Sequence, residues 1–322
     1  MKSRLVLGCL TTEGVVARAR DEFDAVIADG KDDMSGTELV AAANAHQAAA
    51  LLFTTTTRLD GAAIAALPAS VRVAATVSVG YDHIDIAAAR ARGLIVTNTP
   101  DVLTDCTADH TMLMILAACR RGYEYEKIMR EGWRRRIGQG ELLGRRVSGK
   151  RLGIFGMGRI GRAVAARARG FGMEVLYHSR NRLPAELEAG ARYVPTFEAM
   201  LPECDILTLH APAGAATDRI VNARTLALLP PGAVFVNVSR GGLVDEDALF
   251  DALQSGRLFA AGLDVFRAEP DFDLRFAKLQ NVFLTPHIAS ATQETRDGMG
   301  FRALDNAALV LSGQAPRDPL WR

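Results

Sequence analysis

Three polar residues far apart along the chain, Arg240, Glu269 and His287, each follow a short apolar run that is typical of a buried strand. In an open α/β sheet, ligands bind beyond the carboxyl ends of the strands. A guanidinium can hold a carboxylate and polarise a carbonyl group, and an imidazole can donate a proton. A carboxylate can orient that imidazole and favour its protonated form. Each residue alone is an ordinary loop or surface residue, but together they suit the reduction of a 2-oxo acid.

Such a reduction needs a hydride, and a glycine-rich segment predicts the cofactor that carries it. Gly156, Gly158 and Gly161 have the G-x-G-x-x-G spacing between an apolar run at Arg151–Phe155 and a helical pattern at Arg159–Gly170. In that context the glycines permit a tight turn, close approach of a pyrophosphate and packing of the helix on the strand. The pattern predicts dinucleotide binding at this turn. The expected cofactor contacts there are Gly156, Gly158, Arg159, Ile160 and Gly161.

The next predicted strand ends without the acidic residue that usually binds the ribose 2′-hydroxyl of NAD. Ser179 occupies that region, followed by Arg180 and Arg182. A hydroxyl and guanidinium groups suit a 2′-phosphate, since Arg pairs with phosphate through two hydrogen bonds. We therefore expect a preference for NADPH, with NADH as the weaker cofactor. The alternative is that these arginines are solvated loop charges.

Composition limits the classes of protein that this chain can represent. It has 322 residues, 49% of them hydrophobic and 23% charged, with a formal net charge of +1, so nucleic acid and anionic membranes are not expected partners. We find no apolar run long enough for a membrane helix, and no secretory leader. The four cysteines are scattered without a C-x-x-C pair, which predicts reduced thiols, a cytoplasmic location and no metal site.

Apolar runs and helical patterns alternate along the chain, which predicts parallel sheets covered by helices on both faces. We expect an α/β fold of two Rossmann-like, doubly wound domains with the active site in the cleft between them. Residues 1–99 and 288–322 should form a flavodoxin-like substrate-binding domain, and residues 100–287 the dinucleotide-binding domain. The predicted strands are 5–10, 24–27, 48–53, 71–76, 94–97, 151–155, 174–177, 206–209, 234–237, 260–263 and 282–284.

A long helix predicted over Thr104–Arg121 is apolar nearly all round. Such a helix is expected to be buried on every side. Burial between two subunits is one way to achieve this, so the helix favours a homodimer.

Four motifs together resemble the D-isomer-specific 2-hydroxyacid dehydrogenases, and most of all their glyoxylate/hydroxypyruvate reductase branch. The motifs are the glycine-rich turn, residues 237–241 (Asn-Val-Ser-Arg-Gly), residues 262–270 and residues 285–290 (Thr-Pro-His-Ile-Ala-Ser). The resemblance covers nearly the whole chain. It implies that Arg240, Glu269 and His287 are the catalytic trio, and that Asp264 supports the site and contacts the nicotinamide side. It also implies a homodimer built on the helix 104–121.

By the same resemblance, the loop containing Val79 and Gly80 binds the substrate carboxylate, which agrees with the ability of successive backbone N–H groups to hold an anion. Substrate would also contact Arg240 and His287. Further residues near the cofactor would be Thr107, His210, Ala211, Pro212, Val238 and Ser239.

Two departures leave the substrate open. Thr54, which we expect to contact substrate, stands at a strand end where the reductase branch is more apolar, and this favours a hydroxylated substrate such as 2-ketogluconate. The basic run Arg134–Arg136 suits a phosphorylated oxo acid, or is a solvated face. A non-catalytic, dinucleotide-sensing protein of the corepressor type is the alternative from another functional class.

Overall fold

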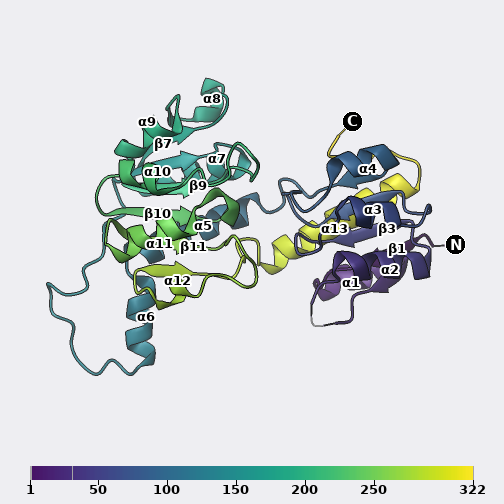
Figure 1. The fold of residues 1–322 in the computed structure, drawn as a ribbon, viewed down its shortest axis with the longest axis horizontal. Helices are drawn as coiled ribbons and strands as arrows, with labels where there is room; N and C mark the ends of the chain where they lie inside the picture. The colour runs from purple at the N-terminus through teal and green to yellow at the C-terminus, as the bar shows by residue number, and fades with distance from the viewer. Residues whose placement is uncertain (1, 31, 322) are drawn as a thin grey trace. The chain divides into compact units, whose positions relative to one another are not determined.

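The structure is a computed structural model that describes residues 2–30 and 32–321. Its contacts divide the chain into two compact units (Figure 1). Unit 1 comprises Met1–Leu103 and Ser290–Arg322, and unit 2 comprises Thr104–Ala289. The last helix of the chain therefore returns to the first unit, as expected from the sequence.

Unit 1 is built on a five-stranded parallel sheet in the order β2-β1-β3-β4-β5. The strands are β1 (Arg4–Leu7), β2 (Asp24–Ile27), β3 (Ala50–Phe53), β4 (Val73–Thr76) and β5 (Ile95–Thr97). The central strands β3 and β4 are buried along their whole length, which explains their continuous apolar sequences. This strand order is that of flavodoxin-like sheets, whose ligand-binding switch point lies between β1 and β3.

The helices of unit 1 begin at residues that cap them. They are α1 (Glu13–Glu22), α2 (Gly36–His46), α3 (Gly61–Ala66), α4 (Ile86–Arg92) and α13 (Gln293–Leu311). The side chains of Thr12, Ser35, Asp60, Asp85 and Thr292 accept a hydrogen bond from the first turn of the helix that follows each. Helices α1 and α13 bury one face of the sheet, and α2, α3 and α4 bury the other.

Unit 2 is built on a seven-stranded parallel sheet in the order β12-β11-β10-β9-β6-β7-β8. The strands are β6 (Arg151–Phe155), β7 (Glu174–His178), β8 (Arg192–Tyr193), β9 (Ile206–Leu209), β10 (Ala233–Asn237), β11 (Leu258–Leu263) and β12 (Val282–Leu284). Counted within the unit, this is the Rossmann order with one strand added. The switch point lies between β6 and β9, next to the glycine-rich turn.

Helices cover both faces of the unit 2 sheet. They are α5 (Thr104–Cys119), α6 (Gly122–Arg130), α7 (Arg159–Gly170), α8 (Ala185–Glu188), α9 (Phe197–Met200), α10 (Ala223–Leu228), α11 (Glu246–Gln254) and α12 (Arg275–Lys278). One core cluster forms under α5 and α7, and the other under α9, α10, α11 and α12. Two parallel-sheet α/β units confirm the predicted fold class.

The predicted elements agree with the structure except where they are short. Strand β8 and helices α8 and α12 are absent from the prediction, whereas the equally short helix α9 is predicted, at 197–201. Two to four residues give only a weak periodicity. The predicted first strand, 5–10, is too long, since β1 ends at Leu7. Beyond it the Leu10 N–H bonds to the carboxylate of Asp33 instead of to a strand.

The division between the units differs slightly from the predicted boundaries. Residues 100–103 belong to unit 1, where Val102 and Leu103 pack against the core that includes α13. Ile288 and Ala289 belong to unit 2, because their N–H groups donate to the carboxylate of Asp264 at 2.9 and 3.0 Å. Hydrogen bonds and side-chain packing, rather than loop composition, set these boundaries.

Within a single chain, the helix predicted at 104–121 is not buried on every side. Helix α5 is largely buried within its own unit, against α7, β10 and β11. A stripe of Asp105, Asp109 and Leu113 is exposed, and Arg167 of α7 forms ion pairs with both aspartates. Within residues 2–30 and 32–321, no helix has both the length and the apolar character needed to cross a membrane.

Candidate active site

The geometry of the turn between β6 and α7 shows why it contains glycines. Gly156 has a φ of 98°, and a Cβ atom there would lie 2.6 Å from the backbone nitrogen of Ala211. A Cβ at Gly161 would lie 2.3 Å from the carbonyl oxygen of Gly156. At Gly158, by contrast, a Cβ would meet no described atom within 4 Å apart from its chain neighbours. The first and third glycines thus permit close packing, and the second leaves open space beside the backbone.

That open space adjoins the start of α7. Gly158 is the N-cap of this helix and has no side chain to bond its first turn. The N–H groups at Ile160 and Gly161 are therefore left for solvent or a ligand, at the positive end of the helix dipole. The first hydrogen bond of the helix, from Arg162 N to Gly158 O, measures 3.0 Å. These features fit the pyrophosphate of a dinucleotide.

The residues expected at a 2′-phosphate have different surroundings. Ser179 Oγ accepts a hydrogen bond of 2.7 Å from Met157 N, which ties the end of β7 to the glycine turn. Arg180 is exposed. Arg182 is already engaged, because its guanidinium bonds both carboxylate oxygens of Glu188, at 2.8 and 3.1 Å. In this structure its guanidinium therefore pairs with a carboxylate, and its role toward a 2′-phosphate stays a prediction.

Glu188 is held charged by this contact. Hydrogen bonds from Arg182 and from the Tyr177 hydroxyl lower the pKa of Glu188 to about 2. The sequence did not indicate the pair, since Glu188 lies on a helix too short to predict.

The remaining residues predicted near the cofactor lie in segments that follow β9 and β10, except Thr107. Ser239 Oγ donates to the Ala211 carbonyl at 2.5 Å and so joins the two segments. Burial lowers the pKa of His210 to about 3, so its imidazole is neutral, and its Nε2 lies 3.0 Å from Thr208 Oγ1. Thr107 is buried in α5, where its carbonyl accepts the Thr111 hydroxyl.

Arg240 follows β10 in a loop held by Asn237. The Asn237 side chain accepts from Ser239 N at 3.0 Å and donates to the Arg240 carbonyl at 2.9 Å. A Cβ at Gly241 would lie 1.9 Å from the Phe266 carbonyl carbon, so the two loops meet backbone to backbone. The sequence places Glu269 three residues beyond Phe266, so this contact brings the arginine loop to the loop of the predicted carboxylate.

Glu269 and His287 form the pair that the sequence predicts. His287 Nδ1 lies 2.7 Å from Glu269 Oε2, and Glu269 Oε1 accepts from Phe266 N at 2.8 Å. Burial works against the charge of this carboxylate. The hydrogen bonds from His287 and Phe266 and the positive charge of Arg240 outweigh it and hold the pKa of Glu269 below its usual range. Glu269 and His287 are therefore in direct contact, and the positive charge of Arg240 acts on the same carboxylate.

Asp264 lies beneath the loop that carries His287. Its side chain is 0% exposed, and its carboxylate accepts the Thr285 hydroxyl at 2.6 Å and the N–H groups of Ile288 and Ala289. Burial opposes its charge, but hydrogen bonds from His110, Thr285 and Ile288 hold the pKa of Asp264 below its usual range. A carboxylate so enclosed supports the loop that carries His287.

His287 itself has an unusual backbone. Its φ is 53°, in the left-handed region that non-glycine residues rarely adopt, and its N–H donates to the Asp264 carbonyl at 2.8 Å. A strained conformation of this kind persists only where the surroundings over-determine it. His110 and Thr285, which the sequence analysis missed, belong to these surroundings. No local pattern marked His110, because Asp105 and Asp109 lie on the same turns of α5 and are exposed.

The predicted substrate residues Val79, Gly80 and Thr54 lie in unit 1, beyond the carboxyl ends of β4 and β3. The Val79 and Gly80 carbonyls accept hydrogen bonds from Asn98 and Ser78, whereas neither N–H has a partner among the described residues. This leaves two donors for an anion. Thr54 Oγ1 donates to Asp33 at 2.5 Å.

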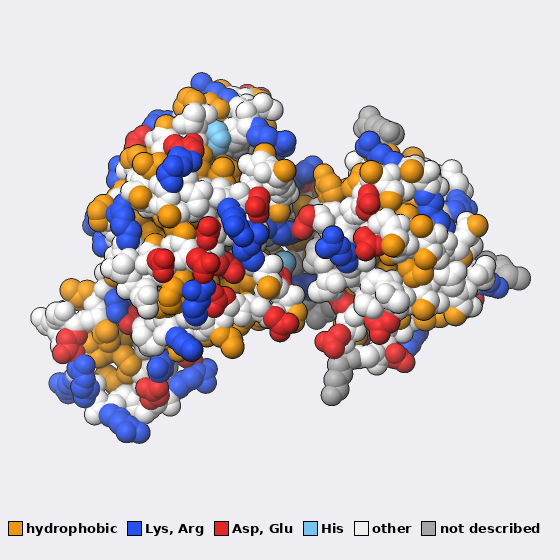
Figure 2. Space-filling view, viewed as in Figure 1, with side chains coloured by type: hydrophobic (Ala, Val, Ile, Leu, Met, Phe, Trp, Pro, Cys, Tyr) orange, Lys and Arg blue, Asp and Glu red, His pale blue; other side chains and the backbone are white. Residues whose placement is uncertain are grey.

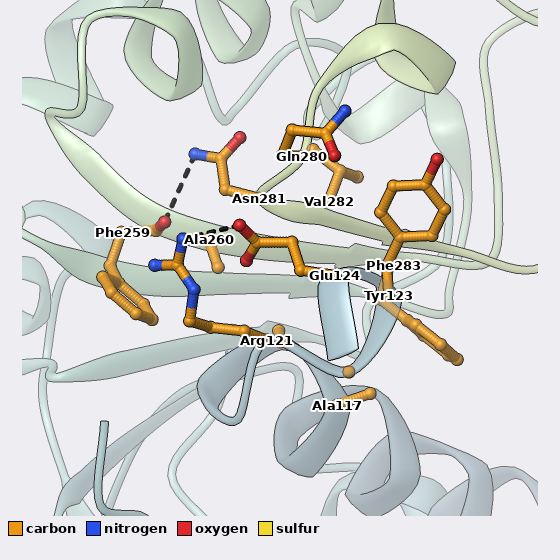
Figure 3. Close-up of a pocket in the computed structure, with 12 residues that line it drawn as sticks. Ala117, Arg121, Tyr123, Glu124, Phe259, Ala260, Gln280, Asn281, Val282 and Phe283 are labelled. Carbon is orange, nitrogen blue, oxygen red and sulfur yellow. Dashed lines mark hydrogen bonds and ion pairs between the residues drawn. The ribbon is translucent and has the colours of Figure 1, made fainter. Parts of the chain in front are cut away.

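A small pocket elsewhere in unit 2 is not this site (Figure 3). It is lined by Arg121 and Glu124, which form an ion pair, and by Phe259 and Val282. Phe259 and Val282 stand near the amino ends of β11 and β12, whereas Asp264 and Thr285 follow the carboxyl ends of the same strands. The pocket therefore lies at the opposite edge of the sheet from the predicted chemistry.

Comparison with known proteins agrees with this geometry. The family model described as the NAD binding domain of D-isomer specific 2-hydroxyacid dehydrogenases matches residues 112–289. A glyoxylate reductase of Thermococcus litoralis is 46% identical over 250 residues, which cover 76% of this chain and 75% of that protein. The structure of a glyoxylate reductase from Paecilomyes thermophila matches with a TM-score of 0.88 and 32% identity, covering 99% of this chain and 98% of that one.

A second solved structure is an NADPH-dependent glyoxylate/hydroxypyruvate reductase of Sinorhizobium meliloti in complex with NADP and malonate. It matches with a TM-score of 0.87 and 34% identity, covering 100% of this chain and 97% of that one. A family model that covers half of the sequence, together with relatives similar over most of their length, leaves no doubt about kinship: the chain belongs to the D-isomer-specific 2-hydroxyacid dehydrogenase family.

Proposed function

We propose that this protein reduces small 2-oxo acids, glyoxylate and hydroxypyruvate foremost, to D-2-hydroxy acids by hydride transfer from a nicotinamide dinucleotide. The observation that carries the proposal is the 2.7 Å contact between His287 Nδ1 and Glu269 Oε2, with the charge of Arg240 acting on the same carboxylate. These groups follow the carboxyl ends of strands in a sheet of Rossmann order, where ligands of such sheets bind.

The geometry assigns a task to each residue. The bound nicotinamide supplies the hydride. Arg240 holds the carboxylate of the oxo acid and polarises its carbonyl oxygen. Because Nδ1 of His287 is taken by Glu269, its Nε2 is the nitrogen that donates a proton to the developing alkoxide. Glu269 keeps the ring in that orientation. Solvent then restores the proton.

We propose NADPH as the preferred cofactor, with Ser179 and Arg180 as the residues that bind the 2′-phosphate. The exposure of Arg180 and the absence of a carboxylate at residues 179–183 support this assignment. Arg182 contributes only by its charge, since Glu188 holds its guanidinium.

We place the substrate carboxylate at the N–H groups of Val79 and Gly80, and the far end of the substrate near Thr54. The unpartnered donors in the β4–α4 loop support the first assignment. The position of Thr54 directly after β3, at the switch point of the unit 1 sheet, supports the second. In this proposal unit 1 is the substrate-binding domain.

We propose that the protein is a homodimer, with exposed Leu113 of α5 together with α6 and the loop after it at the interface. Met129, Trp133 and Leu143 are 60%, 55% and 61% exposed, and Figure 2 shows hydrophobic and basic side chains gathered over the α6 segment. Large apolar side chains exposed together mark interaction surfaces. Four free thiols favour a reducing compartment, so we propose the cytoplasm.

One steady-state screen tests the proposed function. Loss of the absorbance of reduced nicotinamide is followed with NADPH and with NADH, on glyoxylate, hydroxypyruvate, pyruvate, 2-ketogluconate and phosphohydroxypyruvate. We expect the highest kcat/KM for NADPH with glyoxylate or hydroxypyruvate. A higher kcat/KM with 2-ketogluconate or phosphohydroxypyruvate would identify that compound as the preferred substrate instead. Tight NADPH binding without turnover of any oxo acid would support the corepressor alternative.

A further inference from the structure

The proposed acid, His287, depends on a loop that is unusually constrained. Residues 285–289 enclose the carboxylate of Asp264, which receives the Thr285 hydroxyl and two backbone N–H groups. The His287 N–H donates to the Asp264 carbonyl, so the residue is bonded on both its main chain and its side chain. This network holds His287 at a φ of 53°. If one of these hydrogen bonds is removed, the loop can relax toward ordinary backbone conformations.

His110 of α5 joins this network from another element. Its Nε2 lies 3.1 Å from Thr285 Oγ1 and 3.4 Å from Asp264 Oδ1, and its side chain is only 10% exposed. A hydroxyl has one proton, and that of Thr285 goes to the Asp264 carboxylate at 2.6 Å, since the alternative acceptor, Met114 Sδ, is weak and 3.6 Å away. Both oxygens that face His110 are thus acceptors. We assign the proton of His110 to Nε2 accordingly.

We propose that His110 is a positioning residue for the reaction: its Nε2–H fixes Thr285 and Asp264 and thereby holds His287 in its reactive orientation. The inference rests on the proposed function, because it assigns His110 to the support of that proton donor. The bland alternative is a core histidine whose hydrogen bonds only complete the packing of α5 on the sheet. In the positioning role the imidazole controls the conformation of the 285–289 loop. In the packing role it controls the stability of the whole unit.

Paired substitutions at His110 and Thr285 distinguish the positioning role from the packing role. His110→Leu removes the donor at similar volume, whereas His110→Gln keeps an N–H donor that reaches about as far. Thr285→Val removes the hydroxyl and keeps the shape, whereas Thr285→Ser keeps the hydroxyl. His46→Leu is the matched control, since it removes an imidazole of unit 1 that bonds the Asp24 carbonyl.

The expected result is a kcat for the 2-oxo acid reduced on the order of tenfold in His110→Leu and Thr285→Val, because a small misplacement of a reacting group is costly. His110→Gln and Thr285→Ser should recover most of the activity. The dissociation constant for NADPH and the melting temperature should change little. Hydrogen exchange at Ile288 and Ala289 should quicken in the two impaired variants.

Two outcomes would overturn the inference. One is a kcat of His110→Leu equal to that of the wild type. The other is a loss of activity that follows the loss of melting temperature, is not recovered by His110→Gln and leaves exchange at Ile288 and Ala289 unchanged. A wild-type protein that reduces no oxo acid would instead refute the proposed function. Hydrogen exchange at Ile288 and Ala289 does not depend on activity. It therefore shows whether His110 holds the loop even if the wild type reduces no oxo acid.

Discussion

At the scale of single residues, the pairing of His287 with Glu269 allows the simplest test of the mechanism. His287→Ala removes the proton donor and leaves the glycine turn and the start of α7 intact. We expect kcat for oxo-acid reduction to fall by roughly 10²–10⁴-fold, which is what general acid catalysis contributes. The NADPH dissociation constant, measured by fluorescence titration, should be nearly unchanged. A large loss of NADPH affinity would instead place His287 in cofactor binding.

Glu269 acts through its charge, which its lowered pKa maintains at neutral pH. Glu269→Gln keeps the size of the side chain but removes the anionic acceptor that orients the His287 ring through Nδ1. We expect kcat for oxo-acid reduction to fall on the order of tenfold, because a small misplacement of a reacting group is costly. Steady-state kinetics at neutral pH, where the wild-type carboxylate is charged, measure the loss. An unchanged kcat would remove Glu269 from the mechanism.

At the scale of elements, the contact between two loops brings Arg240 toward Glu269. Gly241→Ala would place a Cβ 1.9 Å from the Phe266 backbone, which cannot move as a flexible side chain would. We expect a loss of about 3 kcal/mol in the free energy of unfolding, at the upper end for overpacking, together with reduced kcat. Gly242→Ala is the control, because its Cβ would meet no described atom within 4 Å. Denaturant unfolding compares the two, and equal losses would contradict this account of the loop contact.

The connection of α8 to β7 through Glu188 predicts a pH dependence of stability. The pKa of Glu188 is lowered to about 2, so the folded state binds its proton less readily than the unfolded state. Its contribution is therefore complete above the ordinary value near 4.5 and disappears as the pH falls from there toward 2. The melting temperature of the wild type should exceed that of Glu188→Gln by a constant amount above about pH 5, and the gap should close in acid.

Glu186→Gln is the matched control for this experiment, because Glu186 lies on the same helix and is exposed. It should leave the melting curve unchanged across the range. A gap between the wild type and Glu188→Gln that persists at pH 2 would show that the carboxylate acts through packing and not through its charge.

At the scale of the whole molecule, the two units protect most of the thiols. Burial raises the pKa values of Cys9, Cys119 and Cys204 to about 12, so their thiolates are scarce near neutrality. Cys106 is only half-buried. A thiol reagent at pH 8 should therefore label Cys106 first in the native protein and all four cysteines in denaturant. Rapid native labelling of the other three would show that a unit opens readily.

Much of this architecture was predictable because it depends on local patterns. The strand, glycine turn and helix at residues 151–170 follow from apolar periodicity and from the conformational freedom of glycine, both of which are properties of neighbouring residues. The position of Arg240, Glu269 and His287 after strands was predictable for the same reason. The topology of parallel sheets then brings the carboxyl ends of those strands to one edge.

What the sequence by itself determined was therefore the fold class and the dinucleotide-binding turn, and it predicted which groups react. Only the tertiary structure decided which side chains hold those groups in place. It paired Arg182 with Glu188, enclosed Asp264 and revealed His110 as the neighbour of Asp264. The physical reason is that charge pairing and burial depend on atoms brought together from distant positions in the chain, and no local pattern records those distances.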